Sequence, residues 1–354
     1  MSSGQSGQSG HSRQSGQSGQ SGQSGQSGQS GQIEQIARED GRIVVSGLTK
    51  QYRRVRAVDD LSFTVQPGRV TGFLGPNGAG KTTTLRMILN LVTPTAGKAT
   101  IGGRHYAELS QPLRHVGAIL EASSAHKGRT GRNHLRVICA AAGFPLSRAD
   151  EMLELVGLTP AAKRKFRGYS LGMKQRLGIA AALLGDPRVL ILDEPANGLD
   201  PEGIRWMRDL LRSLALQGRT ILVSSHLLSE MELLADDVVI IAAGRLVTQG
   251  PMETVLNGLA GGGAAGSDSA GGGAVTSERI RVRTPQPEEL LAELGSVVSS
   301  HSEVDGALLI TGVSAAEVGA AALRASVELH ELVAEKPDLE HVFLELTAGK
   351  AAIR

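Results

Sequence analysis

The stretch Gly75-Pro76-Asn77-Gly78-Ala79-Gly80-Lys81-Thr82 decides the fold of this 354-residue chain. It follows the apolar residues 70–74, expected to form a buried strand, and precedes residues 81–91, expected to form a helix. That order is the strand–loop–helix context of the phosphate-binding pattern G-x-x-x-x-G-K-[ST]. Glycines permit the turns that point successive N–H groups inward, and the helix N-terminus favours anions. The stretch therefore predicts a phosphate-binding loop in an α/β protein.

Within this loop, the polar side chains have expected roles in holding ATP and Mg²⁺. We expect Lys81 to reach the β- and γ-phosphates and Thr82 to ligate magnesium. The expected nucleotide-binding residues of the loop and the start of the helix are Gly75, Pro76, Asn77, Gly78, Ala79, Gly80, Lys81, Thr82 and Thr83.

A second pair of candidate residues, Asp193 and Glu194, follows the apolar run at residues 189–192. With a phosphate loop upstream, Asp193 is expected to hold the magnesium and Glu194 to act as general base for the attacking water. The plainer alternative is an acidic pair that marks the strand exit before Pro195.

Short β-branched runs separated by amphipathic helical patterns predict a mainly parallel sheet for the central part of the chain. Ile204, Met207, Leu211 and Leu214, for example, share one helix face. Residues 43–49 and 61–65 instead alternate apolar and polar, which predicts an antiparallel β layer. The parallel runs are residues 70–74, 189–192, 221–224 and 238–241.

The order of these motifs resembles the nucleotide-binding subunit of an ATP-binding-cassette (ABC) transporter, over residues 41 to about 251. The resemblance implies that Tyr52 stacks on adenine and that His226 is the switch histidine of the catalytic site. It implies that Ser170 and Gly172, in the signature stretch, contact ATP bound by the opposite subunit, and that Asp200, in the loop before the next helix, is a nucleotide-binding residue.

Two motifs depart from the family pattern. The signature Leu-Ser-Gly-Gly-Gln appears here as Tyr169-Ser170-Leu171-Gly172-Met173, so the serine and the second glycine remain. Glu121 stands where the family usually has a glutamine that touches magnesium and the membrane subunit. A carboxylate there still provides an oxygen ligand. In this substitution the chain resembles the subgroup that exports bacitracin-like and lantibiotic peptides.

Composition divides the chain into segments. Residues 1–40 are dominated by a Ser-Gly-Gln repeat with nothing apolar to bury, which predicts a disordered tail; a Gln-rich self-associating segment is the alternative. Residues 41–256 form the expected ATP-binding domain, with a helical subdomain at about 128–168 that in the family docks on the membrane protein. The Gly-rich residues 257–276 predict a linker, and residues 277–354 a small α+β accessory domain.

In the helical subdomain, the apolar residues of one segment are expected in the core rather than at an exposed contact. They are Met152, Leu153, Leu155, Val156 and Leu158.

The overall composition excludes several classes of protein. A net charge of +2 and few aromatic residues do not suggest a nucleic-acid binder, and the single cysteine, Cys139, is expected to be a small buried residue in a reducing compartment. No apolar run is long enough to cross a bilayer. With the resemblance, this implies a peripheral protein on the cytoplasmic face of the cell membrane.

The resemblance implies an ATPase that powers an exporter of an antibiotic, peptide or drug through a separate membrane-spanning permease subunit. One phosphate loop and one signature per chain imply a head-to-tail pair with a second ATP-binding subunit, taken here as an identical copy, around two ATP molecules. The alternative is a soluble ABC-type ATPase acting on nucleic acid or ribosomes. Such proteins usually carry two cassettes or a long insertion, and this chain has one phosphate loop.

Overall fold

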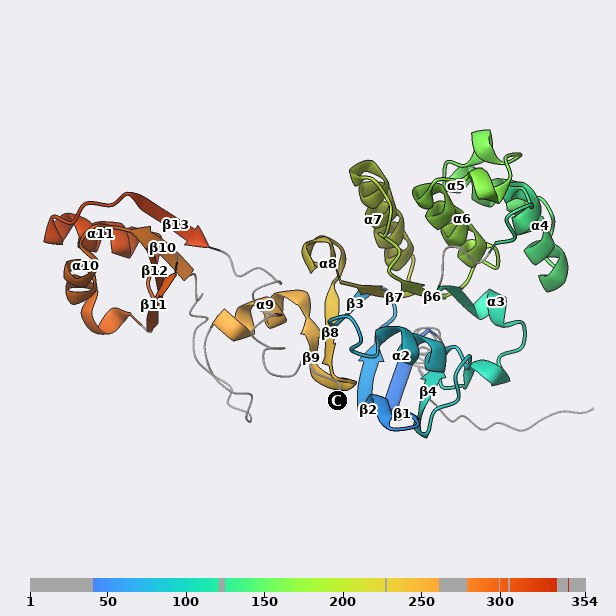
Figure 1. Cartoon of the computed structure of the whole chain (residues 1–354), viewed down its shortest axis with the longest axis horizontal. Helices are drawn as coiled ribbons and strands as arrows, with labels where there is room; N and C mark the ends of the chain where they lie inside the picture. The colour runs from blue at the N-terminus through green and yellow to red at the C-terminus, as the bar shows by residue number, and fades with distance from the viewer. Residues whose placement is uncertain are drawn as a thin grey trace, which may run out of the picture.

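The computed structural model describes residues 41–120, 125–226, 228–260, 279–298, 300–304, 306–335 and 343. The expected tail, Glu121 and most of the expected linker lie outside these residues. Within them the strands form three sheets, of three, six and four strands (Figure 1).

The six-stranded sheet carries the phosphate loop at the end of one of its central strands. Its order is β5-β6-β7-β3-β8-β9, and every neighbouring pair is parallel except β8 and β9. Its strands are β3 (Val70–Leu74), β5 (Val116–Ile119), β6 (Val189–Asp193), β7 (Thr220–Ser225), β8 (Asp237–Ala242) and β9 (Arg245–Pro251). The predicted mainly parallel sheet is confirmed.

The residues of β6 show why this sheet is covered on both faces. Leu190 and Leu192 point into a core formed with the helices, whereas Val189 and Ile191 point into a core formed with the β layer. Successive side chains of a strand alternate between faces, so a continuous apolar run is required where both faces are buried.

The predicted antiparallel layer is also confirmed, as a sheet of order β2-β1-β4. Its inner face packs on the six-stranded sheet, where the rings of Phe63 and Phe73 stack with centroids 5.2 Å apart. The three strands are β1 (Ile43–Tyr52), β2 (Val55–Val65) and β4 (Ala96–Ile101).

The helices of this part of the chain divide into those beside the sheet and a helical lobe. Figure 1 shows α4, α5 and α6 gathered in that lobe, with α7 between it and α8. Met152, Leu153, Val156 and Leu158 are buried as predicted, but Leu155 is exposed, because α5 turns this residue away from its neighbours. The helices are α2 (Lys81–Ile88), α3 (Pro112–His115), α4 (Gly131–Ala142), α5 (Arg148–Leu155), α6 (Leu171–Leu183), α7 (Pro201–Leu216), α8 (Leu228–Leu234) and α9 (Met252–Ala260).

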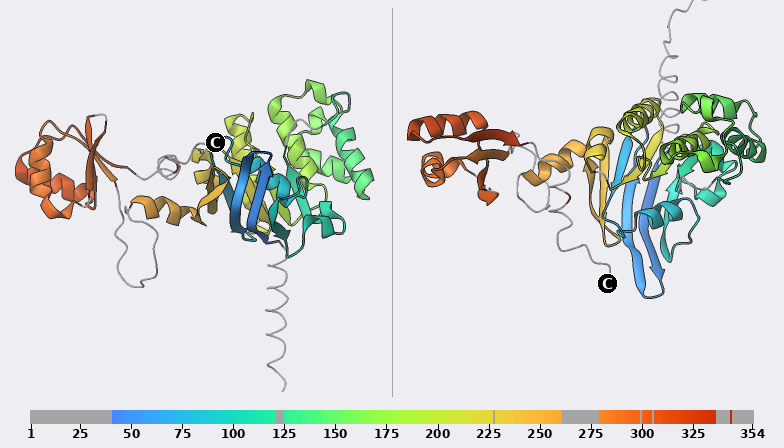
Figure 2. Two further views of the ribbon diagram at one scale, coloured as in Figure 1. Left: turned by 60° about the horizontal axis from the view of Figure 1, so that its bottom comes forward. Right: turned by 45° about the horizontal axis from the view of Figure 1, so that its top comes forward.

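The C-terminal unit has its own sheet, of order β11-β12-β10-β13, and its own apolar core. The chain order strand–helix–strand–strand–helix–strand with this antiparallel sheet is the ferredoxin-like arrangement. The unit lies apart from the other sheets in all views (Figures 1 and 2). Its elements are β10 (Arg279–Arg283), α10 (Pro287–Leu294), β11 (Ser300–Val304), β12 (Ala307–Thr311), α11 (Ala315–Ala325) and β13 (Glu331–Glu335).

No helix among the described residues combines the length and the apolar character that crossing a bilayer requires. Cys139 lies fully buried in α4, as expected for a small apolar residue, and burial raises the pKa of its thiol.

Candidate functional site

The loop between β3 and α2 adopts a backbone that only glycine permits at several positions. Gly78 and Gly80 have φ values of 82° and 103°, in the left-handed region. A Cβ on Gly80 would lie 2.5 Å from the carbonyl oxygen of Ala57, and one on Gly75 would lie 2.6 Å from that of Ile241. Asn77 and Gly78 form the exposed tip of the loop. The loop is therefore compressed against the surrounding backbone while its tip remains open to a ligand.

Lys81 begins α2, and its amine lies within the curve of the loop. Its Nζ donates hydrogen bonds to the carbonyl oxygens of Gly75 at 2.6 Å and Pro76 at 3.4 Å, and it lies 3.9 Å from Oε1 of Glu194. Burial lowers the pKa of Lys81 below its ordinary 10.5, and the carboxylates of Glu194 and Asp193 oppose this change. The carboxylates thus favour a cation at the position where a phosphate-binding loop requires one.

Asp193 ends β6, and two hydroxyl groups donate to its carboxylate. Thr82 Oγ1 donates to Oδ2 at 2.7 Å, and Ser224 Oγ, from the neighbouring strand β7, donates to Oδ1. The hydroxyl of Thr82 and the carboxylate of Asp193 are hard oxygen ligands of the kind Mg²⁺ accepts alongside phosphate oxygens. Two of the three predicted metal ligands, Thr82 and Asp193, are adjacent, so these residues fit a magnesium ion. Among the described residues no cluster of three or more His, Cys, Asp or Glu forms a separate metal site.

Glu194 directly follows β6, with a φ of 50° in the left-handed region. Its N–H faces both the carbonyl oxygen of Ser224 at 3.2 Å and the hydroxyl of Ser224 at 3.0 Å. Its Oε2 lies 2.7 Å from Nδ1 of His226 and accepts the His226 N–H at 3.3 Å. An ionised carboxylate only accepts hydrogen bonds, so Nδ1 carries the proton in this contact. The structure brings the two predicted catalytic residues together beside Lys81.

The predicted signature and loop residues lie at the starts of α6 and α7. Ser170 caps α6 by accepting a hydrogen bond from the N–H of Met173 at 3.2 Å, and Asp200 caps α7 by accepting one from Gly203 at 2.9 Å. Gly172 lies against this second loop, since a Cβ there would be 3.0 Å from the carbonyl oxygen of Gly198. The hydrogen bonds that Ser170 and Asp200 accept are thus local, within the first turns of α6 and α7.

Three further predicted positions have different outcomes. Tyr52 ends β1 with 46% of its surface exposed, and the amine of Lys50 lies 5.0 Å from its ring centroid. Thr83 is half-buried in the first turn of α2. Glu121 lies outside the described residues. The exposed ring of Tyr52 leaves a face available for stacking.

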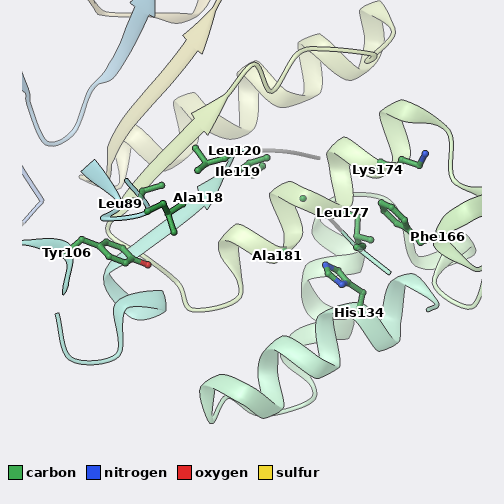
Figure 3. A pocket seen from close by; sticks show the side chains of 13 residues that line it. Leu89, Tyr106, Ala118, Ile119, Leu120, His134, Phe166, Lys174, Leu177 and Ala181 are labelled. Atoms are coloured by element: carbon green, nitrogen blue, oxygen red, sulfur yellow. The ribbon is translucent and has the colours of Figure 1, made fainter. Parts of the chain in front are cut away.

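A pocket of about 300 Å³ lies away from the phosphate loop, between the end of β5 and the helical lobe (Figure 3). Ile119 and Leu120 line one side, and Leu177 and Ala181 of α6 line the other. His134 of α4 also lines it, and its Nδ1 is buried with no hydrogen-bond partner among the residues that the structure describes. Burial lowers the pKa of His134, and the charge of Arg129 adds to the effect.

Sequence reasoning missed two polar residues of this site. Ser224 contacts both acidic residues, and Gln175 of α6, which is buried, donates from Nε2 to the carbonyl oxygen of Glu194 at 3.2 Å. The available signal for Ser224 was a polar side chain in an otherwise buried strand that pairs with β6. Gln175 lies two residues after the signature stretch Tyr169 to Met173, and nothing in the sequence indicates which backbone it faces.

Comparisons with known proteins agree with this geometry. The profile of the family described as "ABC transporter" matches residues 58–197, and residues 278–340 match a family described only as a domain of unknown function. The bacitracin transport ATP-binding protein BcrA of Bacillus licheniformis is 47% identical over 214 residues, covering 60% of this chain and 70% of that protein. The Nod factor export ATP-binding protein I of Burkholderia lata is 36% identical over 304 residues, covering 84% of this chain and 94% of that protein.

A solved structure described as the ATP-binding subunit of an ABC transporter superposes on this chain with a TM-score of 0.56. The two are 29% identical, and the match covers 60% of this chain and 91% of the other. The superposed part is therefore nearly the whole of an ATP-binding cassette.

Proposed function

The chain belongs to the ATP-binding subunits of ABC transporters and is an ATPase, and on this premise we propose that it powers the export of an antibiotic or peptide across the cell membrane. The names of its relatives support this proposal, since they are a bacitracin transport protein and a Nod factor export protein. The structural observation that carries the proposal is the contact of Glu194 with His226 beside Lys81, which is a site suited to ATP hydrolysis. The similarity of the chain to those transport proteins connects this hydrolysis to export.

The site residues have distinct roles in hydrolysis. Glu194 takes a proton from the attacking water while the oxygen of that water bonds to the γ-phosphorus. The bond between the γ-phosphorus and the β–γ bridging oxygen breaks, and the products are ADP and phosphate. His226 holds the Glu194 carboxylate through its Nδ1–H, and Lys81 stabilises negative charge on the phosphates. Thr82 and Asp193 would hold Mg²⁺, which supplies charge neutralisation to the triphosphate when bound.

ABC ATP-binding subunits dimerise and work with membrane permease subunits. We propose that here Ser170 and Gly172 of one copy face the ATP held by the loop of an identical copy, with Asp200 beside them. The N-terminus of α6, capped by Ser170, supports this arrangement, because a capped helix N-terminus favours a phosphate. Tyr52, with its exposed ring at the end of β1, is proposed to stack on the adenine.

The permease is proposed to contact the helical lobe, which holds the protein at the cytoplasmic face of the membrane. The pocket between Leu120 and α6 supports this placement, since it is mostly apolar and Leu120, one of its lining residues, directly precedes Glu121 in the sequence. Movement of the helical lobe would then be transmitted to the end of β5. The alternative of a soluble ATPase acting on nucleic acid or ribosomes is not favoured, because the similar proteins are transport and export subunits.

The test couples hydrolysis to resistance in one experiment. The chain, either natural or with Glu194→Gln, is expressed with its permease in a sensitive bacterium, and growth is measured in bacitracin and lantibiotics. We expect resistance with the natural chain only, together with ATPase activity that Glu194→Gln abolishes in the purified chain. Equal growth of both strains on every compound would reject the export role, and ATPase activity retained by Glu194→Gln would reject the catalytic assignment.

A further inference from the structure

Gln175 makes a contact with the catalytic region that joins two separate parts of the cassette. It lies in the second turn of α6, with 2% of its surface exposed, and its Nε2 donates to the main-chain carbonyl of Glu194 at 3.2 Å. The helix that begins at the signature serine therefore reaches the general base of its own chain by a direct hydrogen bond.

The backbone of Glu194 needs such support. Its φ of 50° is uncommon for a residue with a Cβ, and a conformation of this kind persists when its surroundings over-determine it. The N–H of Glu194 is held by Ser224, and its carbonyl oxygen also accepts from the N–H of Asn197 at 3.2 Å. Ser224 belongs to the neighbouring strand β7, whereas Gln175 supplies a hydrogen bond from a helix, α6. In this orientation the carboxylate meets His226 at 2.7 Å.

The next residue, Arg176, fixes α6 to its neighbours. Its Nη1 donates to the carbonyl oxygen of Val156, after α5, at 3.1 Å, and its guanidinium lies 4.3 Å from the ring centroid of Trp206 on α7. Near the start of α6, Leu171 lies against Gly198, where an added Cβ would approach its side chain to 2.2 Å. A displacement of α6 therefore carries Gln175 with it, and the Gln175 bond connects that displacement to Glu194.

We propose that Gln175 is a positioning residue for Glu194, through which the place of the signature helix controls the orientation of the general base in the same chain. This rests on the proposed role of Glu194 in hydrolysis. The hydrogen bond acts on the backbone rather than on ATP, so it contributes to the rate of the chemical step and leaves nucleotide binding to the phosphate loop. Binding of ATP against Ser170 of one site would then influence hydrolysis at the other.

The test replaces Gln175 with methionine, which has a similar length and no donor, in the purified full chain. Displacement of a catalytic group by about 1 Å can lower a rate by about 100-fold, so we expect kcat to fall by about tenfold or more while KM for ATP stays within about twofold. The matched control is Lys174→Met, the adjacent residue on α6, whose amine lies 5.5 Å from the ring centroid of Phe166 rather than at the catalytic site. Its kcat should stay close to that of the natural chain.

A second variant, Gln175→Glu, separates a positioning bond from simple packing. A buried glutamate has a raised pKa, so the fraction that is protonated, and can donate to the Glu194 carbonyl, should grow between about pH 8 and about pH 6. The kcat of Gln175→Glu relative to the natural chain should therefore rise as the pH falls, whereas that of Gln175→Met should not.

The outcomes are distinct. A kcat of Gln175→Met within twofold of Lys174→Met, or a loss confined to KM, overturns the proposal. If circular dichroism shows that Gln175→Met does not fold, the proposal is overturned when the kcat of Gln175→Glu relative to the natural chain does not change with pH. If the natural chain itself hydrolyses no ATP, or Glu194→Gln retains activity, the proposed function fails instead, so the two failures are distinguishable.

Discussion

At the residue scale, Ser224 is the side chain that joins the two acidic residues of the site. Its hydroxyl donates to Asp193 and faces the N–H of Glu194, and it is fully buried at the end of β7. A buried carboxylate that loses a donor carries an unfavourable desolvation free energy. Ser224 therefore affects the stability of the fold and the catalytic geometry together.

We expect Ser224→Ala to lower the free energy of unfolding by about 1–3 kcal/mol, because a buried charged acceptor loses its partner. We also expect kcat to fall by about tenfold or more, since both Asp193 and Glu194 are left less constrained. Urea unfolding and steady-state hydrolysis measure the two effects. Ser213→Ala is the control, because Ser213 is an exposed residue of α7 whose hydroxyl donates to the carbonyl oxygen of Leu210. An unaltered kcat in Ser224→Ala would contradict this assignment.

His134 provides a pH dependence whose sign follows from its surroundings. Burial, with the charge of Arg129, lowers its pKa below the ordinary 6.5, so the folded chain binds fewer protons here than the unfolded chain. Its contribution to stability is then present above about pH 6.5 and is lost as the pH falls through the folded pKa. His134→Asn should lose less stability than the natural chain between about pH 7.5 and about pH 5.5.

Thermal unfolding at these two pH values measures that difference, with His126→Asn as a control at an exposed histidine. A natural chain and a His134→Asn variant whose Tm values fall in parallel would show that His134 is not responsible.

The site residues that sequence could predict are those held at fixed spacings. Lys81 and Thr82 follow the glycines of their own loop, and Asp193 and Glu194 end a strand that is recognisable as an apolar run. Ser224 and Gln175 could not be predicted, because their contacts depend on the pairing of β6 with β7 and on the rotation of α6 about its axis. Neither property is encoded by a local pattern.

At the scale of elements, the starts of α6 and α7 serve both the fold and the proposed second ATP contact. Asp200 accepts the Gly203 N–H and thereby satisfies one of the free donors in the first turn of α7. A single substitution to alanine would therefore mix loss of the helix cap with loss of any nucleotide contact.

A pair of variants separates these effects. Asp200→Ala should lower the free energy of unfolding by about 1 kcal/mol, whereas Asp200→Ser should retain most of it, because serine also caps helices. If Asp200 contributes to the ATP site beyond its cap, both variants should lose ATPase activity to a similar extent. Full activity in Asp200→Ser would limit the role of Asp200 to capping. Urea unfolding and hydrolysis rates on the same samples provide the comparison.

The elements were predictable where one pattern dominated. The buried strands and α7 follow from apolar runs and from a single apolar face, but β4 contains Gly97 and Lys98, and β11 reads as Ser-His-Ser-Glu-Val. These strands depend on pairing with a neighbour rather than on their own composition, since strand propensity reflects context. The helix expected over residues 81–91 ends at Ile88, because Asn90 adopts a left-handed backbone.

At the scale of the whole molecule, the cassette presents its phosphate loop and its signature as two separate features. The C-terminal unit has a separate core and sheet, and the described residue Phe343 packs against the main core of the cassette. The Gln175 contact connects the signature helix to the general base within one chain. In the proposed arrangement, a complete ATP site requires the signature of another chain, and this is the central claim about how this protein works.

Complementation between two inactive chains tests that claim most directly. Glu194→Gln retains its signature and lacks the base, and Ser170→Arg retains its loop and base and lacks the signature contact. In an equal mixture half of the dimers pair the two variants, and each such dimer has one intact site, so we predict about a quarter of the natural ATPase rate from two chains that are each inactive. Activity in the mixture no greater than the sum of the separate variants would contradict a site shared between chains.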